Sequence, residues 1–268
     1  MALLRLWQID AFTSELFGGN PACVVLDGGL DEPEMQAISA ENNLSETAFL
    51  TPEGSEYAIR WFTPRIEVNL CGHATLASAH VVFEHLEPGR ERVSFSSRSG
   101  PLHATLDPAT RRISLDFPEY HCRAAETTPE LVAALGGARP RETWLGVKLM
   151  AVFAEETQVR SLEPDFARVA KLPGFGLIAT APGAECDFVS RYFVPQAGVD
   201  EDPVTGAAHC QLTPWWAKRL GRNSLHARQI SRRGGELWVE HAPPRVRISG
   251  HAVEYLSGTA RSTSRGAR

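Results

Sequence analysis

One pattern occurs twice in this chain, about half a chain length apart, and it constrains the fold more than any other feature of the sequence. Residues 48–64 read AFLTPEGSEYAIRWFTP, and residues 177–195 read LIATAPGAECDFVSRYFVP. Each copy is an apolar strand, a turn at proline and a second strand that ends in Arg-aromatic-Phe-x-Pro. The two motif arginines, Arg60 and Arg191, stand 131 residues apart, which is too long for a solenoid repeat. The pattern therefore predicts two similar domains that arose by duplication.

Each copy continues with a polar loop and a helix start rich in small residues, CGHAT at 71–75 and DPVTGAA at 202–208. The helices expected at 74–82 and 207–216 are apolar nearly all round, so each should be buried. Strand candidates outnumber helices, and their mostly short connections favour antiparallel pairing. The predicted fold class is α+β, with two pseudo-symmetric domains, each a curled, mostly antiparallel sheet wrapped around a central hydrophobic helix.

The domain boundary is expected at the Phe-Pro step of residues 117–118. We predict a first domain at 1–118 and a second at 119–256, with the option that the last strand packs back on the first domain. Residues 257–268 contain three arginines, no acidic residue and many small residues. This composition predicts a disordered tail.

Charge and composition narrow the class of partner. The net charge of −5 lacks the basic patch expected for nucleic-acid or anionic-membrane binding. No apolar run reaches the ~20 residues of a membrane span, and acidic residues interrupt the N-terminal stretch where a signal peptide would lie. Five cysteines without a Cys-x-x-Cys pair favour a reduced, cytoplasmic protein. We expect a small-molecule partner, no nucleic acid and no membrane.

The two small-residue helix starts are the first candidates for a binding site. Helix N-termini offer unpaired N–H groups and a positive dipole end. Residues 72–74 and 205–207 would let a ligand approach the backbone closely and would cradle a carboxylate in a cleft between the domains. On composition alone, close helix packing is the simpler interpretation, because small residues also permit it.

Three side chains near these helix starts can carry proton chemistry. Glu46 stands at a helix-to-strand junction, where partial burial would raise its pKa and suit it to shuttle a proton. His73 can relay a proton near neutral pH. Asp202 can cap the second helix while facing a ligand. Taken singly, each fits an ordinary structural role equally well: a solvated loop glutamate, a structural histidine and a helix cap.

The chain lacks several well-known site motifs. His73, His80, His209 and Asp202 are available, but no His-x-x-x-His or other short metal-ligand spacing occurs, so a metal site is a weak alternative. There is no Gly-x-Ser-x-Gly, no Walker loop and no Gly-x-Gly-x-x-Gly. These absences lower the odds of an α/β-hydrolase, an NTPase or a Rossmann dehydrogenase.

Taken together, the ordered motifs resemble the PhzF-type phenazine biosynthesis isomerases. The matching stretches are DAFT at 10–13, FGGNPA at 17–22, NLSETAF at 43–49, RWFTP at 60–64, CGHAT at 71–75 and DPVTGAA at 202–208. The resemblance covers nearly the whole chain, from about residue 7 to 255. It implies the diaminopimelate-epimerase-like fold, with the active site between two domains, and this agrees with the duplication inferred from the repeat.

The resemblance also implies a reaction. The family moves a proton on a small carboxylate substrate without a cofactor, and its namesake acts on trans-2,3-dihydro-3-hydroxyanthranilate. The family's acid/base glutamate falls on Glu46, its histidine on His73 and its aspartate on Asp202. Substrate contacts are expected from Asn20, Gly72, Ala74, Thr205, Gly206 and Ala207. A cytoplasmic homodimer is expected by resemblance.

Two departures leave alternatives open. The phenazine enzyme has serine where this chain has Ala207, which removes one hydroxyl and puts the phenazine substrate in doubt. Ala207 also allows a catalytically silent family member that binds a metabolite or a protein. Related epimerases use one thiol from each domain. Here Cys71 occupies the first thiol position but Pro203 the second, which disfavours a two-thiol racemase and leaves an amino-acid epimerase that uses Glu46 with Cys71.

Overall fold

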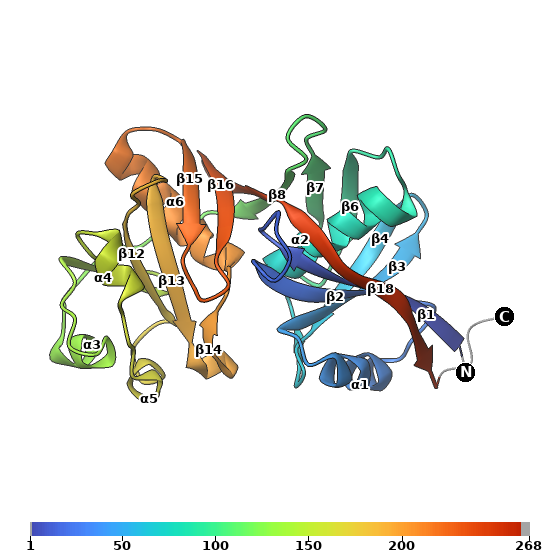
Figure 1. Ribbon diagram of the computed structural model, residues 1–268, viewed down its shortest axis with the longest axis horizontal. Helices are drawn as coiled ribbons and strands as arrows, with labels where there is room; N and C mark the ends of the chain where they lie inside the picture. Colours follow the sequence, from blue (N-terminus) through green and yellow to red (C-terminus); the bar gives the residue numbers. More distant parts are fainter. Residues whose placement is uncertain (1, 264–268) are drawn as a thin grey trace. The chain divides into compact units, whose positions relative to one another are not determined.

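The computed structural model describes residues 2–263 and divides the chain into two compact units (Figure 1). The first unit is Met1–Asp116 with Ser249–Arg268, and the second is Phe117–Ile248. The segment from Ser249 onward is grouped with the first unit, whereas the predicted boundary at residue 256 left open whether the last strand packs on the first domain.

The first unit is a mixed sheet with two helices and a π-helical extension. Strands β1 and β2 are antiparallel, β2 and β3 are parallel, β3 and β4 are antiparallel, β4 and β6 are parallel, and β6, β7 and β8 continue antiparallel. Its elements are β1 (Ala2–Ala11), β2 (Asn20–Leu26), α1 (Glu32–Asn42), β3 (Glu46–Glu53), β4 (Glu56–Phe62), β5 (Glu67–Val68), α2 (Gly72–Val81), η1 (Val82–Leu86), β6 (Arg92–Ser96), β7 (Leu102–Leu106), β8 (Ile113–Pro118) and β18 (Ala252–Ser262).

The second unit has the same succession of pairings. Strands β10 and β11 are antiparallel, β11 and β12 are parallel, β12 and β13 are antiparallel, β13 and β15 are parallel, and β15 and β16 are antiparallel. Its elements are β9 (Arg123–Ala125), α3 (Pro129–Ala134), β10 (Glu142–Leu145), β11 (Leu149–Val152), α4 (Glu156–Arg160), α5 (Phe166–Val169), β12 (Leu177–Pro182), β13 (Phe188–Val194), η2 (Pro195–Ala197), β14 (Val199–Asp202), α6 (Gly206–Leu220), β15 (Ser224–Gln229), β16 (Gly235–Ala242) and β17 (Arg245–Gly250).

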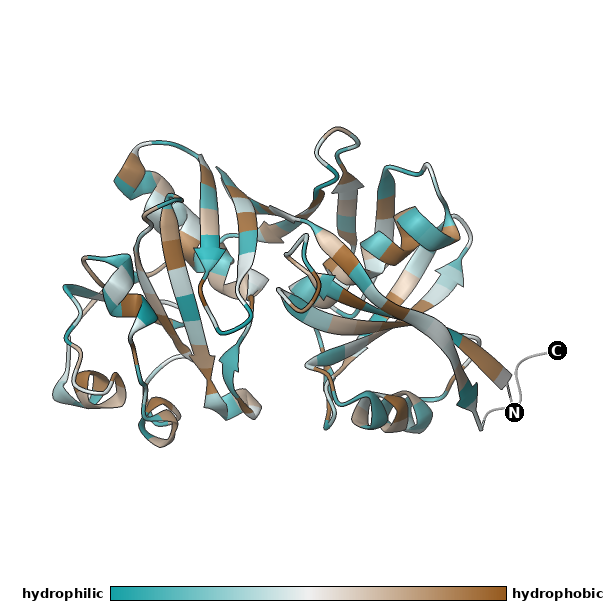
Figure 2. Ribbon diagram, in the orientation of Figure 1, coloured by the Kyte–Doolittle hydropathy of each residue, from teal (hydrophilic) through white to brown (hydrophobic). Residues whose placement is uncertain are grey.

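This shared order confirms the predicted fold class. In each unit a long helix, α2 or α6, follows the repeated strand pair. Most of the strand pairings described for residues 2–263 are antiparallel. Eight of the ten residues of α2 are buried, as expected for a helix without a polar face. Figure 2 shows hydrophobic and hydrophilic segments alternating along the strands of both units.

The inner strands are apolar on both faces because helices cover both. Strands β11 and β12 are buried almost without interruption, whereas β15 alternates buried and half-buried positions. In the second unit, Leu131, Val159 and Val169 of α3, α4 and α5 pack into one core with the strands. In the first unit, Met35 of α1 packs with residues of β2 and β3 in the same way.

The repeated Arg-aromatic-Phe motif has the same structural role in both units. Arg60 donates two hydrogen bonds of 2.8 Å to Glu67, and its guanidinium lies 5.0 Å from the ring centroid of Phe62. Arg191 donates bonds of 2.7 and 2.8 Å to Glu201 and lies 4.9 Å from Phe193. Two-bond Arg–carboxylate pairs fix geometry as well as charge. Each pair holds the strand that leads to the central helix, which explains why the motif occurs twice.

Some local features are not apparent from the sequence. Residues 144–154 have the apolar composition of one strand, but the segment is part of the hairpin β10–β11, turned at residues 146–148. Helix α4 was not anticipated, since a helix of five residues carries little periodicity. Residues 257–262 are not a tail but the second half of β18, which pairs antiparallel with β1 from Ala252 to Ser262. The remainder of the expected tail, 264–268, lies outside the described residues.

Candidate active site

Glu46 is the first residue of β3, at the junction where the sequence placed it. Helix α1 ends at Asn43, which adopts a left-handed conformation (φ 49°) and turns the chain toward the sheet. Strand β3 then runs parallel to β2, with Glu46 opposite Ala22. The side chain of Glu46 is 19% exposed. A carboxylate at the tip of a buried strand is thus partly withdrawn from water.

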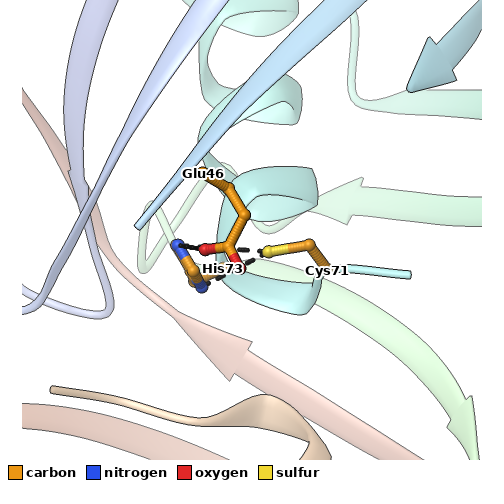
Figure 3. A group of neighbouring side chains, drawn as sticks. All are labelled: Glu46, Cys71 and His73. Carbon is orange, nitrogen blue, oxygen red and sulfur yellow. Dashed lines mark hydrogen bonds and ion pairs between the residues drawn. The ribbon is translucent and has the colours of Figure 1, made fainter. Parts of the chain in front are cut away.

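The carboxylate of Glu46 meets the first turn of helix α2 (Figure 3). Its Oε2 lies 3.1 Å from Nε2 of His73, and the Sγ atom of Cys71 lies 3.5 Å from Nδ1 of the same ring. Oε2 is buried and, among residues 2–263, accepts no hydrogen bond of good geometry despite this close approach. The three side chains point toward one another and come from two elements, β3 and the start of α2.

Asn20 fixes the histidine ring from the other side. Its Nδ2 lies 3.3 Å from Nδ1 of His73, and its Oδ1 accepts a 3.5 Å hydrogen bond from Ser45. Asn20 is wholly buried, at the first position of β2. An amide can offer a ring nitrogen either a donor or an acceptor, so Asn20 suits both the neutral and the charged imidazole.

Electrostatics hold a proton on His73. Burial disfavours its imidazolium, but the negative charges of Cys71, when ionised, and of Glu46 outweigh burial and raise the pKa of His73 well above its ordinary value. Burial, with the charge of Glu46, raises the pKa of Cys71 to about 11. The thiol of Cys71 and the imidazole of His73 therefore both hold their protons more strongly than the same groups do in water.

The same three residues could hold a metal ion. One ligand atom from each of Glu46, Cys71 and His73 lies within 4.8 Å of the others. Oxygen, thiolate and imidazole donors are those that Zn²⁺ accepts. These three donors form no recognisable metal-ligand motif in the sequence, because Glu46 comes from a different element than Cys71 and His73.

A second group of predicted residues lies in the second unit. Asp202 ends β14, and its Oδ2 accepts a 2.5 Å hydrogen bond from the hydroxyl of Thr205. Gln229 of β15 holds this loop: its Oε1 accepts from the backbone N–H of Thr205 at 2.9 Å, and its Nε2 donates to the carbonyl of Asp202 at 2.7 Å. Sequence reasoning did not identify Gln229. It could have been recognised as a polar residue that falls on the buried side of an alternating strand, the side that also carries Leu225 and Ala227.

The two central helices share an uncapped start. Helices α1, α3 and α5 begin with a side chain, from Asp31, Thr128 and Asp165, that accepts a backbone N–H, and α4 begins with a capping box. Helices α2 and α6 begin at Cys71 and Thr205 with no such hydrogen bond. Their first-turn N–H groups and positive dipole ends remain without a side-chain cap.

The structure thus gathers the predicted residues into two groups. Glu46, His73 and Asn20 cluster in the first unit with Cys71, while Asp202 and Thr205 are bonded in the second. Among the expected substrate contacts, Gly72 begins α2 and Gly206 begins α6. Ala207 is exposed, whereas Ala74 is wholly buried within the first turn of α2.

A cavity of about 440 Å³ in the second unit lies over the C-terminal half of α6. In this half Pro214 cannot donate to the carbonyl of Cys210, and the N–H of Tyr120 donates to it instead, at 2.9 Å. None of the predicted site residues lines this cavity. Its walls are Tyr120, His121, Cys122, Trp144, Gln211, Pro214, Trp215, Lys218 and Arg219.

Comparison with known proteins identifies the family that has this architecture. The sequence model of the phenazine biosynthesis-like protein family matches residues 9–258. An uncharacterized isomerase of Pseudomonas aeruginosa is 51% identical, over 96% of this chain and 98% of its own length. The human phenazine biosynthesis-like domain-containing protein is 39% identical, with the same coverage. The crystal structure of a PhzF family protein from Enterococcus faecalis is 44% identical and matches 97% of this chain and all of its own, with a TM-score of 0.94.

More distant solved structures share the fold. A probable proline racemase from Agrobacterium radiobacter shares the fold at 10% identity, with a TM-score of 0.63. The chain belongs to the phenazine biosynthesis-like (PhzC–PhzF) family. It is an isomerase of PhzF type, which confirms the resemblance, the fold and the enzyme class inferred from the sequence. None of the helices in residues 2–263 has the length and apolar composition of a membrane span. The homodimer and the cytoplasmic location stay predictions.

Proposed function

We propose that this isomerase moves a proton on a small carboxylate substrate, with Glu46 as the general acid/base. The observation that carries the proposal is the carboxylate of Glu46, half-buried, with an oxygen that accepts no hydrogen bond of good geometry within residues 2–263. Such an oxygen keeps a lone pair available for a proton. Glu46 would remove a proton from one carbon and return it to another carbon of the same conjugated system, so that atoms and charge balance without a further reactant.

His73 would hold a positive charge beside the reacting carboxylate. Its raised pKa keeps the imidazolium populated near neutral pH, where it can stabilise negative charge that develops on the substrate. Asn20 would keep the ring oriented toward Glu46 through the contact at Nδ1. His73 therefore acts as electrostatic support and polar-proton relay, while Glu46 performs the transfer at carbon.

Asp202 and the uncapped starts of α2 and α6 are further candidates for binding polar groups of a substrate, each considered within its own unit. The first turns of α2 and α6 offer backbone N–H groups to a carboxylate, which supports the choice of an acidic substrate. Asp202, held by Thr205 and Gln229, would accept a hydrogen bond from a substrate hydroxyl or amine. Ala207 lacks the hydroxyl of the phenazine enzyme's serine, so the natural acid differs from the phenazine precursor or binds it more weakly.

Proton NMR in D₂O tests this function with trans-2,3-dihydro-3-hydroxyanthranilate as the first substrate. The wild type should consume it and place deuterium on carbon, and Glu46→Gln should not. Glu41→Gln is the matched control, because Glu41 is an exposed glutamate near the end of α1. Equal turnover by Glu46→Gln and the wild type would reject Glu46 as the base. No consumption by the wild type would reject this substrate, and a panel of other unsaturated carboxylates would follow.

An amino-acid epimerase is the second candidate, and the position of Cys71 favours it. Its thiol lies 3.5 Å from His73, and a pKa of about 11 keeps it protonated, which suits an acid that delivers a proton opposite Glu46. In this case Cys71→Ser would lose deuterium exchange at the α-carbon of an amino acid. Under the isomerase proposal, Cys71→Ser retains most of its turnover.

A further inference from the structure

Lys148 is unusual among the lysines of this chain because its side chain is buried. Of 27 lysine and arginine residues only three are lysines: Lys148, Lys171 and Lys218. Lys171 and Lys218 are exposed, but Lys148 is only 4% exposed. It is the last residue of the turn between β10 and β11. Lysine is almost never buried unless its charge is compensated, so this position requires an explanation.

The backbone of Lys148 is clamped in place. Its N–H donates to Oε1 of Gln211 at 3.1 Å, and its carbonyl accepts from Nε2 of the same side chain at 2.9 Å. Gln211 is wholly buried on α6, the helix that begins beside Asp202 and Thr205. The lysine is thus fixed to the helix whose start carries the predicted site residues of this unit.

The ammonium of Lys148 lies between two aromatic faces. Nζ is 5.4 Å from the ring centroid of Tyr192 and 5.9 Å from that of Tyr120. Ring faces attract a cation within about 6 Å, but they do not neutralise it. Tyr192 is also the residue that pairs with Asp202 across β13 and β14. Through Tyr192, the ammonium and Asp202 belong to the same part of the second unit, and the charge of Asp202 also acts on the ammonium.

Within residues 2–263, no carboxylate, carbonyl or hydroxyl oxygen lies at hydrogen-bond or ion-pair distance from this ammonium. Burial lowers the pKa of Lys148, and the charges of Cys210, when ionised, and of Asp202 act against that decrease from farther away. The side chain as a whole is buried, but Nζ is not one of the fully buried polar atoms without a partner, so the ammonium itself keeps contact with water. An ammonium that reaches water with no acceptor from residues 2–263 is available to an anionic oxygen of a ligand.

We propose that Lys148 is an anion-binding residue, whose ammonium pairs with an anionic oxygen of the ligand that binds beside Asp202. The inference is confined to the second unit, and the chemical class of its ligand is a small carboxylate. The exposure of Lys148 resembles that of His73 and Cys71, at 6% and 7%, which are the groups of the other predicted cluster.

Lysine NMR tests the proposal directly. The double variant Lys171→Arg/Lys218→Arg, grown with ¹³C-lysine, carries one labelled lysine, and that residue is Lys148 in its natural form. Benzoate is the anionic probe, and benzamide is its neutral counterpart. Benzoate should move the Cε signal of Lys148 along a saturating curve, and benzamide should not. No movement with benzoate, or equal movement with both, would overturn the proposal.

Affinity measurements provide the second test. Lys148→Met, which keeps the side-chain length without the charge, should weaken benzoate binding about ten-fold or more in calorimetry, as expected for loss of a charge-assisted hydrogen bond. Lys171→Met should bind as the wild type does. Glu46→Gln should retain both the NMR response and the affinity, so failure of the isomerase assignment and failure of this inference give different results. Wild-type affinity in a folded Lys148→Met variant would refute it.

Discussion

Nε2 of His73 lies 3.1 Å from Oε2 of Glu46, where the first turn of α2 meets the first residue of β3. The contact joins a buried base to a carboxylate that keeps access to water. Each group changes the proton affinity of the other, so their protonation states should be measured together.

Removal of the Glu46 charge should lower the pKa of His73. Burial already opposes the imidazolium, and the variant Glu46→Gln would leave that effect less opposed. The ring nitrogens of His73, followed by ¹⁵N NMR from pH 5 to 10, report the change. Glu41→Gln should leave the titration as it is in the wild type, and an unchanged curve in Glu46→Gln would contradict the assigned cause.

The same pair should make folding depend on pH in a defined direction. Because the folded-state pKa of His73 is raised, its contribution to stability is complete below the unfolded-state value of about 6.5 and is lost as pH rises through the folded-state value. Urea unfolding of wild type and His73→Gln should therefore differ most near pH 6 and converge at alkaline pH. A difference that grows with pH would reverse the sign of the argument.

His209 should make the stability of the protein depend on pH in the opposite direction. Burial lowers its pKa to about 4, and its Nδ1 lies 2.8 Å from the carbonyl of Thr205. The unfolded chain therefore takes up a proton at a higher pH than the folded chain does. Stability should decrease by about 3 kcal/mol between pH 6.5 and 4 from this group alone. Urea titrations of wild type and His209→Gln at pH 7 and 4.5 compare the slopes, and parallel slopes would rule out this contribution.

Zinc should inhibit the enzyme through the Glu46 cluster. Oxygen, sulfur and nitrogen donors within 4.8 Å of one another can be bridged by one ion, which would displace the thiol proton and occupy the base. Added Zn²⁺ should reduce turnover, and a chelator should restore it. Cys71→Ser should be less sensitive, while Cys23→Ser, at a buried cysteine of β2, should respond as the wild type does. Equal sensitivity of all three would place the zinc elsewhere.

Gln229→Met should loosen the Asp202 loop. The substitution leaves the N–H of Thr205 and the carbonyl of Asp202 without their partners, in a buried setting. We expect a loss of about 2 kcal/mol of unfolding free energy, together with a higher KM. Gln196→Met, which removes one 3.5 Å bond, is the control. Unchanged stability and unchanged KM in Gln229→Met would mean that the loop is held by other contacts.

The sequence predicted the fold well where local pattern and global architecture agree. The repeated motif at Arg60 and Arg191 identified two similar units, and the structure adds the reason, a bonded glutamate in each. Apolar composition identified α2 and α6 as buried helices. Both signals are local, which is why they can be read without coordinates.

Tertiary pairing accounts for most of what was missed. The contacts of Gln229 with Thr205 and of Lys148 with Gln211 join residues 24 and 63 positions apart, and no periodicity reports them. Glu46 and His73 were both singled out, but from separate motifs, and only the structure brings their atoms to 3.1 Å. The polar residues 257–262 read as a tail because β18 is half exposed and owes its order to β1.

Strand β18 also has a consequence for the order of assembly. It pairs with β1 along Ala2–Ala11, yet the two strands lie at opposite ends of the chain, with the whole second unit between them. During synthesis, Phe117–Ile248 leaves the ribosome before β18 does. The second unit can therefore finish folding first, while β1 waits with one edge unpaired and open to mispairing. The first unit to be translated is the last to be completed.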